Sequence, residues 1–183
     1  MKKGLSYKMK KINKMKKINK MKTAVIFALL ILILSTLTGC GEAKRKVTEE
    51  DMKISLAKEF QKSKMKGTNW YYKSANGPEV IGICSSKDDL EKRGLEANSA
   101  ADYAMAYIKA NNIPGSPSVK SGSDYTSFVY KKTIMGTKYS YETYIFENGD
   151  EYWLINFSCY TDVWPSYKKI FKKAADSVEF IKD

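Results

Sequence analysis

The chain contains no histidine among its 183 residues, although it has 32 basic and 20 acidic residues. Histidine is the commonest general base in enzymes and the commonest side-chain ligand of transition metals. Its absence excludes hydrolysis by a Ser-His-Asp triad and leaves only carboxylates to hold a metal ion. The sequence also has no glycine-rich phosphate-binding loop. We therefore expect no metal and no cofactor.

The chain also lacks an apolar run long enough to cross a bilayer. Ala24–Leu34 has eleven apolar residues, whereas a membrane-spanning helix needs about 20. Lys20 and Lys22 precede this run, and the stretch Leu37-Thr38-Gly39-Cys40 follows it. A charged start, a short apolar segment and small residues are the order of a secretory signal.

Leu37-Thr38-Gly39-Cys40 resembles the lipobox of bacterial lipoproteins, in which a peptidase cuts before a cysteine that carries lipid. The resemblance implies a signal peptide over residues 1–39, cleavage between Gly39 and Cys40, and lipidation of Cys40. The mature protein would then be anchored through this lipid on the extracytoplasmic face of the cell membrane. An ordinary secretory signal with a chance cysteine is the alternative.

Acidic residues are missing from the first part of the chain. Ten of the basic residues lie in Lys2–Lys22, so the formal charge of +12 belongs mostly to the predicted signal. Without residues 1–39 the chain has 22 basic and 20 acidic residues. Because the excess of positive charge leaves with the signal, we predict no nucleic-acid partner.

Cysteine is scarce, with three in the chain. If Cys40 carries lipid, Cys84 and Cys159 remain as one possible disulfide, which an exported protein could keep. Two cysteines would equally serve as small buried apolar residues, and the sequence leaves both readings open.

Serine–lysine neighbours are the remaining candidates for catalysis. Ser85-Ser86-Lys87 follows a predicted strand, and Ser63-Lys64 forms a second pair. Such pairs are common by chance. An envelope enzyme that uses a Ser-Lys pair, or a Cys84/Cys159 redox couple, is therefore the alternative function.

The N-terminal part of the mature chain is predicted to be helical. Residues 40–47 are charged and are interpreted as a tether, and Thr48 with Asp51 has the spacing of a capping pair. Apolar residues then follow at i, i+4 and i+8, which are Met52, Leu56 and Phe60. We expect a helix over 48–66 and a separate α+β domain over 67–183.

The rest of the chain predicts an antiparallel sheet with helices. Thr126–Ile134, Lys138–Phe146 and Glu151–Tyr160 are strand-like segments joined by short turns, which favours a meander. Trp70–Lys73 and Glu79–Cys84 are predicted strands, and helices are expected over Ser99–Asn111 and Pro165–Ser177. The predicted fold class is α+β, a single domain with a meander sheet flanked by helices.

The closing segment Ile170–Ile181, IFKKAADSVEFI, resembles the end of PsbP-like proteins, where a helix leads through a Ser-Val step into a final strand. The matching positions are Phe171, Ser177, Val178 and Phe180. The resemblance implies a PsbP-like α/β/α sandwich and an accessory role in binding or assembly.

Tyrosines on neighbouring predicted strands must share faces of the sheet, and they are Tyr139, Tyr141, Tyr144, Tyr152 and Tyr160. They would form a platform for glycan rings or a peptide, or else belong to the core, which the sequence favours. The predicted function is a non-enzymatic, membrane-anchored binding or accessory module with an envelope protein or glycan as partner. An exposed tyrosine-lined groove would support binding, and a pocket holding Lys87 against Ser85 would support the enzyme.

Overall fold

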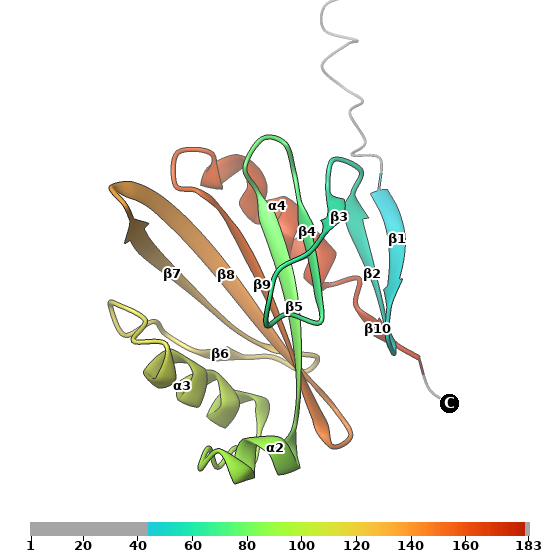
Figure 1. Ribbon diagram of the computed structural model, residues 1–183, viewed down its shortest axis with the longest axis vertical. Coiled ribbons are helices and arrows are strands. Elements are labelled where there is room, and N and C mark those ends of the chain that lie inside the picture. The colour runs from blue at the N-terminus through green and yellow to red at the C-terminus, as the bar shows by residue number, and fades with distance from the viewer. Residues whose placement is uncertain (1–43, 182–183) are drawn as a thin grey trace, which may run out of the picture. The chain divides into compact units, whose positions relative to one another are not determined.

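A seven-stranded antiparallel sheet organises the computed structural model, which describes residues 44–181 (Figure 1). The spatial order of its strands is β3-β4-β5-β9-β8-β7-β6. Their bounds are β3 Gln61–Ser63, β4 Trp70–Lys73, β5 Glu79–Ser86, β6 Lys120–Ser121, β7 Thr126–Ile134, β8 Thr137–Asn148 and β9 Glu151–Tyr160. The predicted meander is therefore confirmed as β7, β8 and β9, which form consecutive hairpins.

A second, three-stranded sheet with the order β1-β2-β10 packs on one face of the large sheet together with a helix. Its strands are β1 Lys44–Glu49, β2 Met52–Ala57 and β10 Glu179–Phe180. The helix is α4, Trp164–Ala175. Phe171 of α4 and Ile54 of β2 belong to the same buried cluster as Trp153 and Phe157 of β9.

The helix expected over 48–66 is wrong. These residues form the end of β1, all of β2 and β3, with a tight turn at Glu50 and Asp51. Residues four positions apart share one face of a helix, but they also share one face of a strand, because side chains alternate with a period of two. The apolar residues at i, i+4 and i+8 therefore fit both structures. Met52, Ile54 and Leu56 are buried in alternation, which is the pattern of a strand. Lys44 to Val47, assigned to the tether, belong to β1.

Two helices cover part of the opposite face, and both begin at serine caps. α2 spans Lys87–Lys92 and α3 spans Ala100–Ala110. Ser86 accepts a hydrogen bond from the Asp89 amide, and Ser99 accepts one from the Asp102 amide, as its spacing predicts. The N-cap of α4 is Val163, whose amide donates a hydrogen bond to the Asp162 carboxylate at 3.0 Å.

The central strand β9 is buried along the whole of one face and along the first half of the other, which makes it the middle layer of the domain. One face carries Trp153, Ile155, Phe157 and Cys159 toward α4 and β2. The other carries Tyr152 and Leu154 toward α2 and α3. The described residues thus form one α+β domain, as the fold class predicted, in which helices and a small sheet sandwich a large antiparallel sheet.

Candidate functional site

The Ser-Lys candidates do not form a catalytic pair in the structure. Lys87 donates a hydrogen bond to Glu147 at 2.7 Å, and this bond raises the pKa of the lysine. A lysine acting as a general base needs a lowered pKa, so the shift goes the wrong way. Ser85 is hydrogen-bonded to the Tyr103 hydroxyl, and Ser86 is occupied as the cap of α2. The hollow that Lys87 lines is formed with Glu91, Leu95, Glu96, Ala97 and Asn98, and Ser85 does not line it.

Cys84 and Cys159 are free thiols. Cys84 lies opposite Trp153 in the β5–β9 pairing, and Cys159 is six residues further along β9. At about 3.3 Å per residue the two cysteines are about 20 Å apart, whereas a disulfide needs Cα atoms within about 7 Å. The possible disulfide and the redox couple are therefore both contradicted, and the reading as buried apolar residues holds for Cys159.

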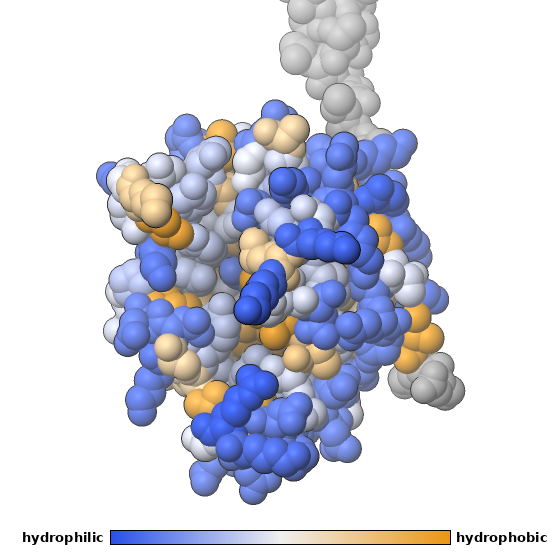
Figure 2. All heavy atoms as spheres, viewed as in Figure 1, coloured by the Kyte–Doolittle hydropathy of each residue, from blue (hydrophilic) through white to orange (hydrophobic). Residues whose placement is uncertain are grey.

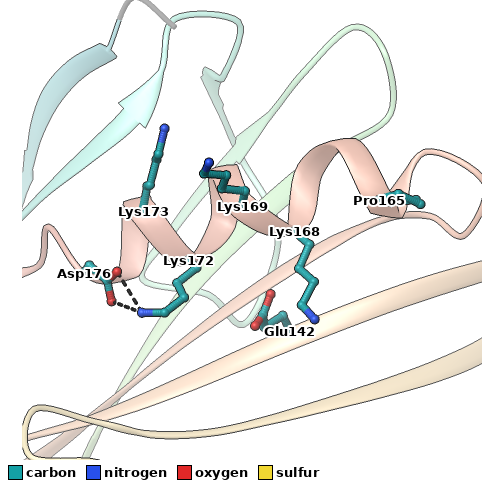
Figure 3. Close-up of a pocket in the computed structure, with 7 residues that line it drawn as sticks. All are labelled: Glu142, Pro165, Lys168, Lys169, Lys172, Lys173 and Asp176. Carbon is teal, nitrogen blue, oxygen red and sulfur yellow. Dashed lines mark hydrogen bonds and ion pairs between the residues drawn. The ribbon is translucent and has the colours of Figure 1, made fainter. Parts of the chain in front are cut away.

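A hollow of about 450 Å³ follows the outer side of α4, above β8 (Figure 3). Glu142 of β8 forms its floor. Four lysines of α4 also line it, which are Lys168, Lys169, Lys172 and Lys173. Burial raises the pKa of Glu142, against the lowering effect of the Tyr144 hydroxyl and of the nearby lysines. Lys172 is bound to Asp176 and to the Tyr125 hydroxyl, so this lysine belongs to the structure rather than to an open anion site.

A second hollow, of about 300 Å³, opens on the face of the large sheet that carries α3, and Figure 2 looks onto this face. We call it the tyrosine groove. It is lined by residues of β5, β7, β8 and β9 and of the β3–β4 connection, which are Met65, Glu79, Ile81, Ile134, Tyr139, Tyr141, Asn156 and Ser158. The half of this face next to α2 and α3 is covered, and the groove lies on the half beyond them.

The strand pairing decides which of the five tyrosines reach the groove. Tyr139 pairs with Tyr160 and Tyr141 with Ser158, so these side chains share one face with the groove. Tyr144 points to the opposite face and is buried in the core against Phe157. Tyr152 is on the groove face but is buried under α3, where its ring stacks on Tyr103. Tyr144 and Tyr152 therefore belong to the core, as the sequence favours. Tyr141 is half-buried against the core and also lines the groove, and Tyr139 lines the groove as well.

Aromatic stacking holds the groove wall in place. The rings of Tyr141 and Tyr130 are stacked with their centroids 4.5 Å apart and their planes 3° from parallel. Tyr139 packs on Tyr160 with a centroid distance of 5.3 Å. Aromatic pairs of this kind contribute about 0.5–1.5 kcal/mol beyond the area they bury. The two groove tyrosines are therefore oriented before any ligand arrives.

Polar groups lie between the rings. Tyr71 donates a hydrogen bond to Glu79 at 2.9 Å, and burial together with this bond raises the pKa of Tyr71 to about 12. A carboxylate has about four acceptor sites, so Glu79 keeps capacity for donors of a ligand. Thr143 donates to Asn156 at 2.8 Å, which fixes that amide in the floor. The groove thus offers aromatic faces, a carboxylate, an amide and the Ser158 hydroxyl.

Sequence reasoning missed several groove residues, Glu79, Met65 and Asn156 among them. Alternation along each strand places Asn156 and Ser158 on the face of Tyr152, and that signal was available. The approach of Met65 and Glu79 to the tyrosines depends on β5 pairing with β9, which no local pattern reveals.

Within residues 44–181, no cluster of three or more metal-ligating side chains occurs.

No protein-family model matches this sequence, and no curated protein matches it. Among solved structures, the fold is similar to that of Mog1p, a Ran-binding protein of Saccharomyces cerevisiae, with a TM-score of 0.53 and 5% identity over 78% of this chain and 97% of Mog1p. A Bacteroides thetaiotaomicron protein matches with a TM-score of 0.51 and 12% identity over 76% of this chain. The chain spans about half of that protein, 48% of its length.

Cyanobacterial PsbP from Synechocystis also matches, with a TM-score of 0.44 and 13% identity over 79% of this chain and 99% of the PsbP chain. At such identities the similarity to Mog1p and to the Bacteroides protein concerns the fold alone. It agrees with the mixed α+β architecture described above.

Proposed function

We propose that the protein is an extracytoplasmic lipoprotein, anchored through lipid on Cys40, whose domain binds a ligand in the tyrosine groove without catalysing a reaction. The predicted signal peptide and its cleavage site lie outside the described residues, so the anchor rests on the sequence Leu37-Thr38-Gly39-Cys40. No helix within residues 44–181 is long and apolar enough to span a membrane.

The observation that carries the binding role is the open, tyrosine-lined groove. Ligand sites are typically concave and largely apolar, with a few placed polar groups. Tyr139 and Tyr141 supply the apolar faces here, and Glu79 with Asn156 supplies the polar groups. The competing enzyme has no comparable support, because Lys87 is bound to Glu147 and the two cysteines are far apart.

An envelope glycan or an envelope protein segment is the proposed partner. A sugar ring stacks its apolar face on tyrosine and donates its hydroxyls to a carboxylate or an amide. An extended peptide would instead place an apolar side chain against the rings. Both use the same groove residues, so the experiment below separates them.

The binding test compares groove variants in the lipidated protein, crosslinked in its own membrane and purified. Tyr139→Ala combined with Tyr141→Ala removes both rings, and at about 1 kcal/mol for each ring contact we expect at least a tenfold loss of the crosslinked partner. Tyr141→Phe should keep most of it. Met105→Ala, at an exposed position on α3 away from the groove, is the matched control.

The captured material is then treated with protease or with glycan-degrading enzymes, which shows the class of partner. Equal recovery with the double alanine variant and with wild type would reject the groove as the binding site. The anchor is tested apart from this by Cys40→Ser, which should leave the precursor unprocessed or release the protein from the membrane. A Cys40→Ser variant that fractionates like wild type would reject the lipid anchor.

A further inference from the structure

The tip of the β7–β8 hairpin carries two exposed apolar side chains, Ile134, which also lines the tyrosine groove, and Met135. Met135 is fully exposed and Ile134 is 42% exposed. Figure 2 shows apolar side chains gathered over this tip, at the upper left of the molecule. A large apolar side chain in contact only with water contributes nothing to the stability of the domain.

The backbone makes methionine an unfavourable residue at this tip. Met135 has φ +48° and Gly136 has φ +80°, so both turn residues are in the left-handed region. Asn, Asp and Gly are preferred at the first position of such a two-residue hairpin turn. Met135 therefore carries a conformational cost as well as a solvation cost in the isolated domain.

The apolar tip is surrounded by positive charge. Lys131 and Lys132 precede it on β7, Lys138 follows it on β8, and all three are exposed. No acidic residue occurs between Thr126 and Tyr141. An apolar tip with a collar of lysines is the composition of segments that enter the interface of an anionic bilayer.

The tip lies at the end of the domain where the predicted anchor attaches. Lys44, the first residue of β1, pairs with Ala57, the last residue of β2, and β3 starts four positions after Ala57. Gln61 of β3 pairs with Lys73, the last residue of β4. The chain then turns into β5, whose first residue, Glu79, pairs with Ser158 of β9. Lys44 and the β7–β8 turn therefore lie at the same end of the domain, although they belong to different sheets, as Figure 1 shows.

The length of chain before β1 keeps this end close to the bilayer. Only residues 41–43 separate Cys40 from Lys44, so the distance from Cys40 to Lys44 is at most about 14 Å. A lipid on Cys40 would hold the Lys44 corner at the membrane surface. The hairpin tip is across the width of the sheet from this corner, and a tilt of the domain brings it to the same surface.

Aromatic side chains next to the tip fit the same environment. Tyr139 and Tyr160 form a pair two residues inside the turn, and Tyr160 is 40% exposed. Tyrosine is enriched at the boundary between lipid and water, where its ring meets the acyl region and its hydroxyl stays hydrated. The pair Tyr139 and Tyr160 would therefore lie at the boundary between lipid and water, and only the turn beyond this pair would enter the acyl region.

We infer that Ile134 and Met135 insert into an anionic phospholipid surface, so that the domain is held at two points, by the lipid on Cys40 and by the β7–β8 hairpin. The geometry of this inference rests on the proposed anchor. Its consequence is a fixed orientation, in which the tyrosine groove, with Ile134 and Tyr139 in its wall, opens beside the membrane surface.

The test uses the processed, lipidated protein in vesicles of phosphatidylcholine, with or without phosphatidylglycerol. Met135→Cys carries an environment-sensitive fluorophore, and Asp150→Cys is the control. Asp150 is exposed at the β8–β9 turn, at the other end of β8. Unsubstituted protein treated in parallel corrects for labelling of Cys84 and Cys159.

We expect a several-fold rise in fluorescence with a blue shift for the label at position 135 in phosphatidylglycerol vesicles, and no change at position 150. Lys131→Gln with Lys132→Gln should lower the equilibrium constant for insertion of the tip by about fivefold per lysine in these vesicles, and leave neutral vesicles unaffected. A label at position 135 that stays as hydrated as the one at position 150 in both vesicle types would overturn the inference.

Flotation of the same vesicle samples shows whether the protein is attached to the membrane, whereas the fluorescence at position 135 shows whether the hairpin is inserted. Protein that floats while its tip stays in water contradicts the inserted hairpin and supports the anchor. Protein that does not float contradicts the anchor, and the fluorescence of position 135 with excess vesicles then decides the hairpin by itself.

Discussion

Gly82 of β5 lies directly under the indole ring of Trp70 of β4. A Cβ atom at position 82 would come within 2.0 Å of Trp70 Cε2 and 2.3 Å of Cζ2. The two residues pair across the strands, and Trp70 is buried in the core beside α4 and β2. The absence of a side chain at Gly82 therefore creates the space that the indole occupies.

Gly82→Ala should destabilise the domain by about 1–3 kcal/mol, because the added methyl group would overlap the buried Trp70 ring and displace it. Urea unfolding of the variant measures the loss. Combining Gly82→Ala with Trp70→Phe should recover part of it, since the smaller ring leaves room for the methyl group. Full stability of Gly82→Ala alone would contradict this packing.

Glu49 joins the small sheet to the large one through two donors. Lys62 of β3 donates to both carboxylate oxygens at 2.8 and 2.7 Å, and the Tyr72 hydroxyl of β4 donates as well.

Glu49→Ala should lower the free energy of unfolding by about 1.5–3 kcal/mol, because the buried Tyr72 hydroxyl loses its acceptor. Lys62 is 61% exposed, so Lys62→Met should cost less than about 1 kcal/mol. Chemical denaturation of both variants checks the order, and equal losses would contradict it.

Glu142 should make the domain less stable as the pH rises. Burial raises the pKa of Glu142 above its usual value of 4.5, so the folded state holds this proton more tightly than the unfolded chain does. The stabilisation is complete below pH 4.5 and is lost as the pH rises through the raised pKa. Glu142→Gln should then increase Tm at pH 7 by about 2–5 °C and have little effect at pH 4.

Thermal melts at the two pH values test Glu142→Gln. Glu147→Gln is the control on the same strand, because Glu147 is exposed and bound to Lys87. Its Tm should not rise at pH 7. A Glu142→Gln variant with the same Tm difference at both pH values would contradict the assignment.

The two strand cysteines should behave as unreactive free thiols. Burial, assisted by Glu151, raises the pKa of Cys84 to about 12, and burial raises that of Cys159 to about 11. Because the thiolate is the nucleophile, both should react slowly with a thiol reagent at pH 8 in the folded protein. Denaturation without a reductant should expose both thiols, and a reductant should leave Tm unchanged. Their appearance only after reduction would show a disulfide.

Local sequence signals determined much of the large sheet and its helices. The alternation in Glu151–Tyr160 and the short turns on either side of β8 are encoded within a few residues, and so are the Ser86 and Ser99 caps. The turns and caps are formed by hydrogen bonds between near neighbours, and the alternation follows from the geometry of a strand, so local patterns were sufficient to predict them. The same kind of reading failed for β2, because apolar residues four positions apart suit a helix and a strand equally.

Tertiary structure alone decided the site. Alternation along β8 already separates Tyr139 and Tyr141 from Tyr144, but only the tertiary structure decided that α3 covers Tyr152 and leaves the other half of that face open. Pairing of β5 with β9 then brought Glu79 to the two remaining rings and carried Cys84 away from Cys159. These contacts join residues up to about 80 positions apart, and their free energy comes from burying both faces of β9, which no segment can do alone.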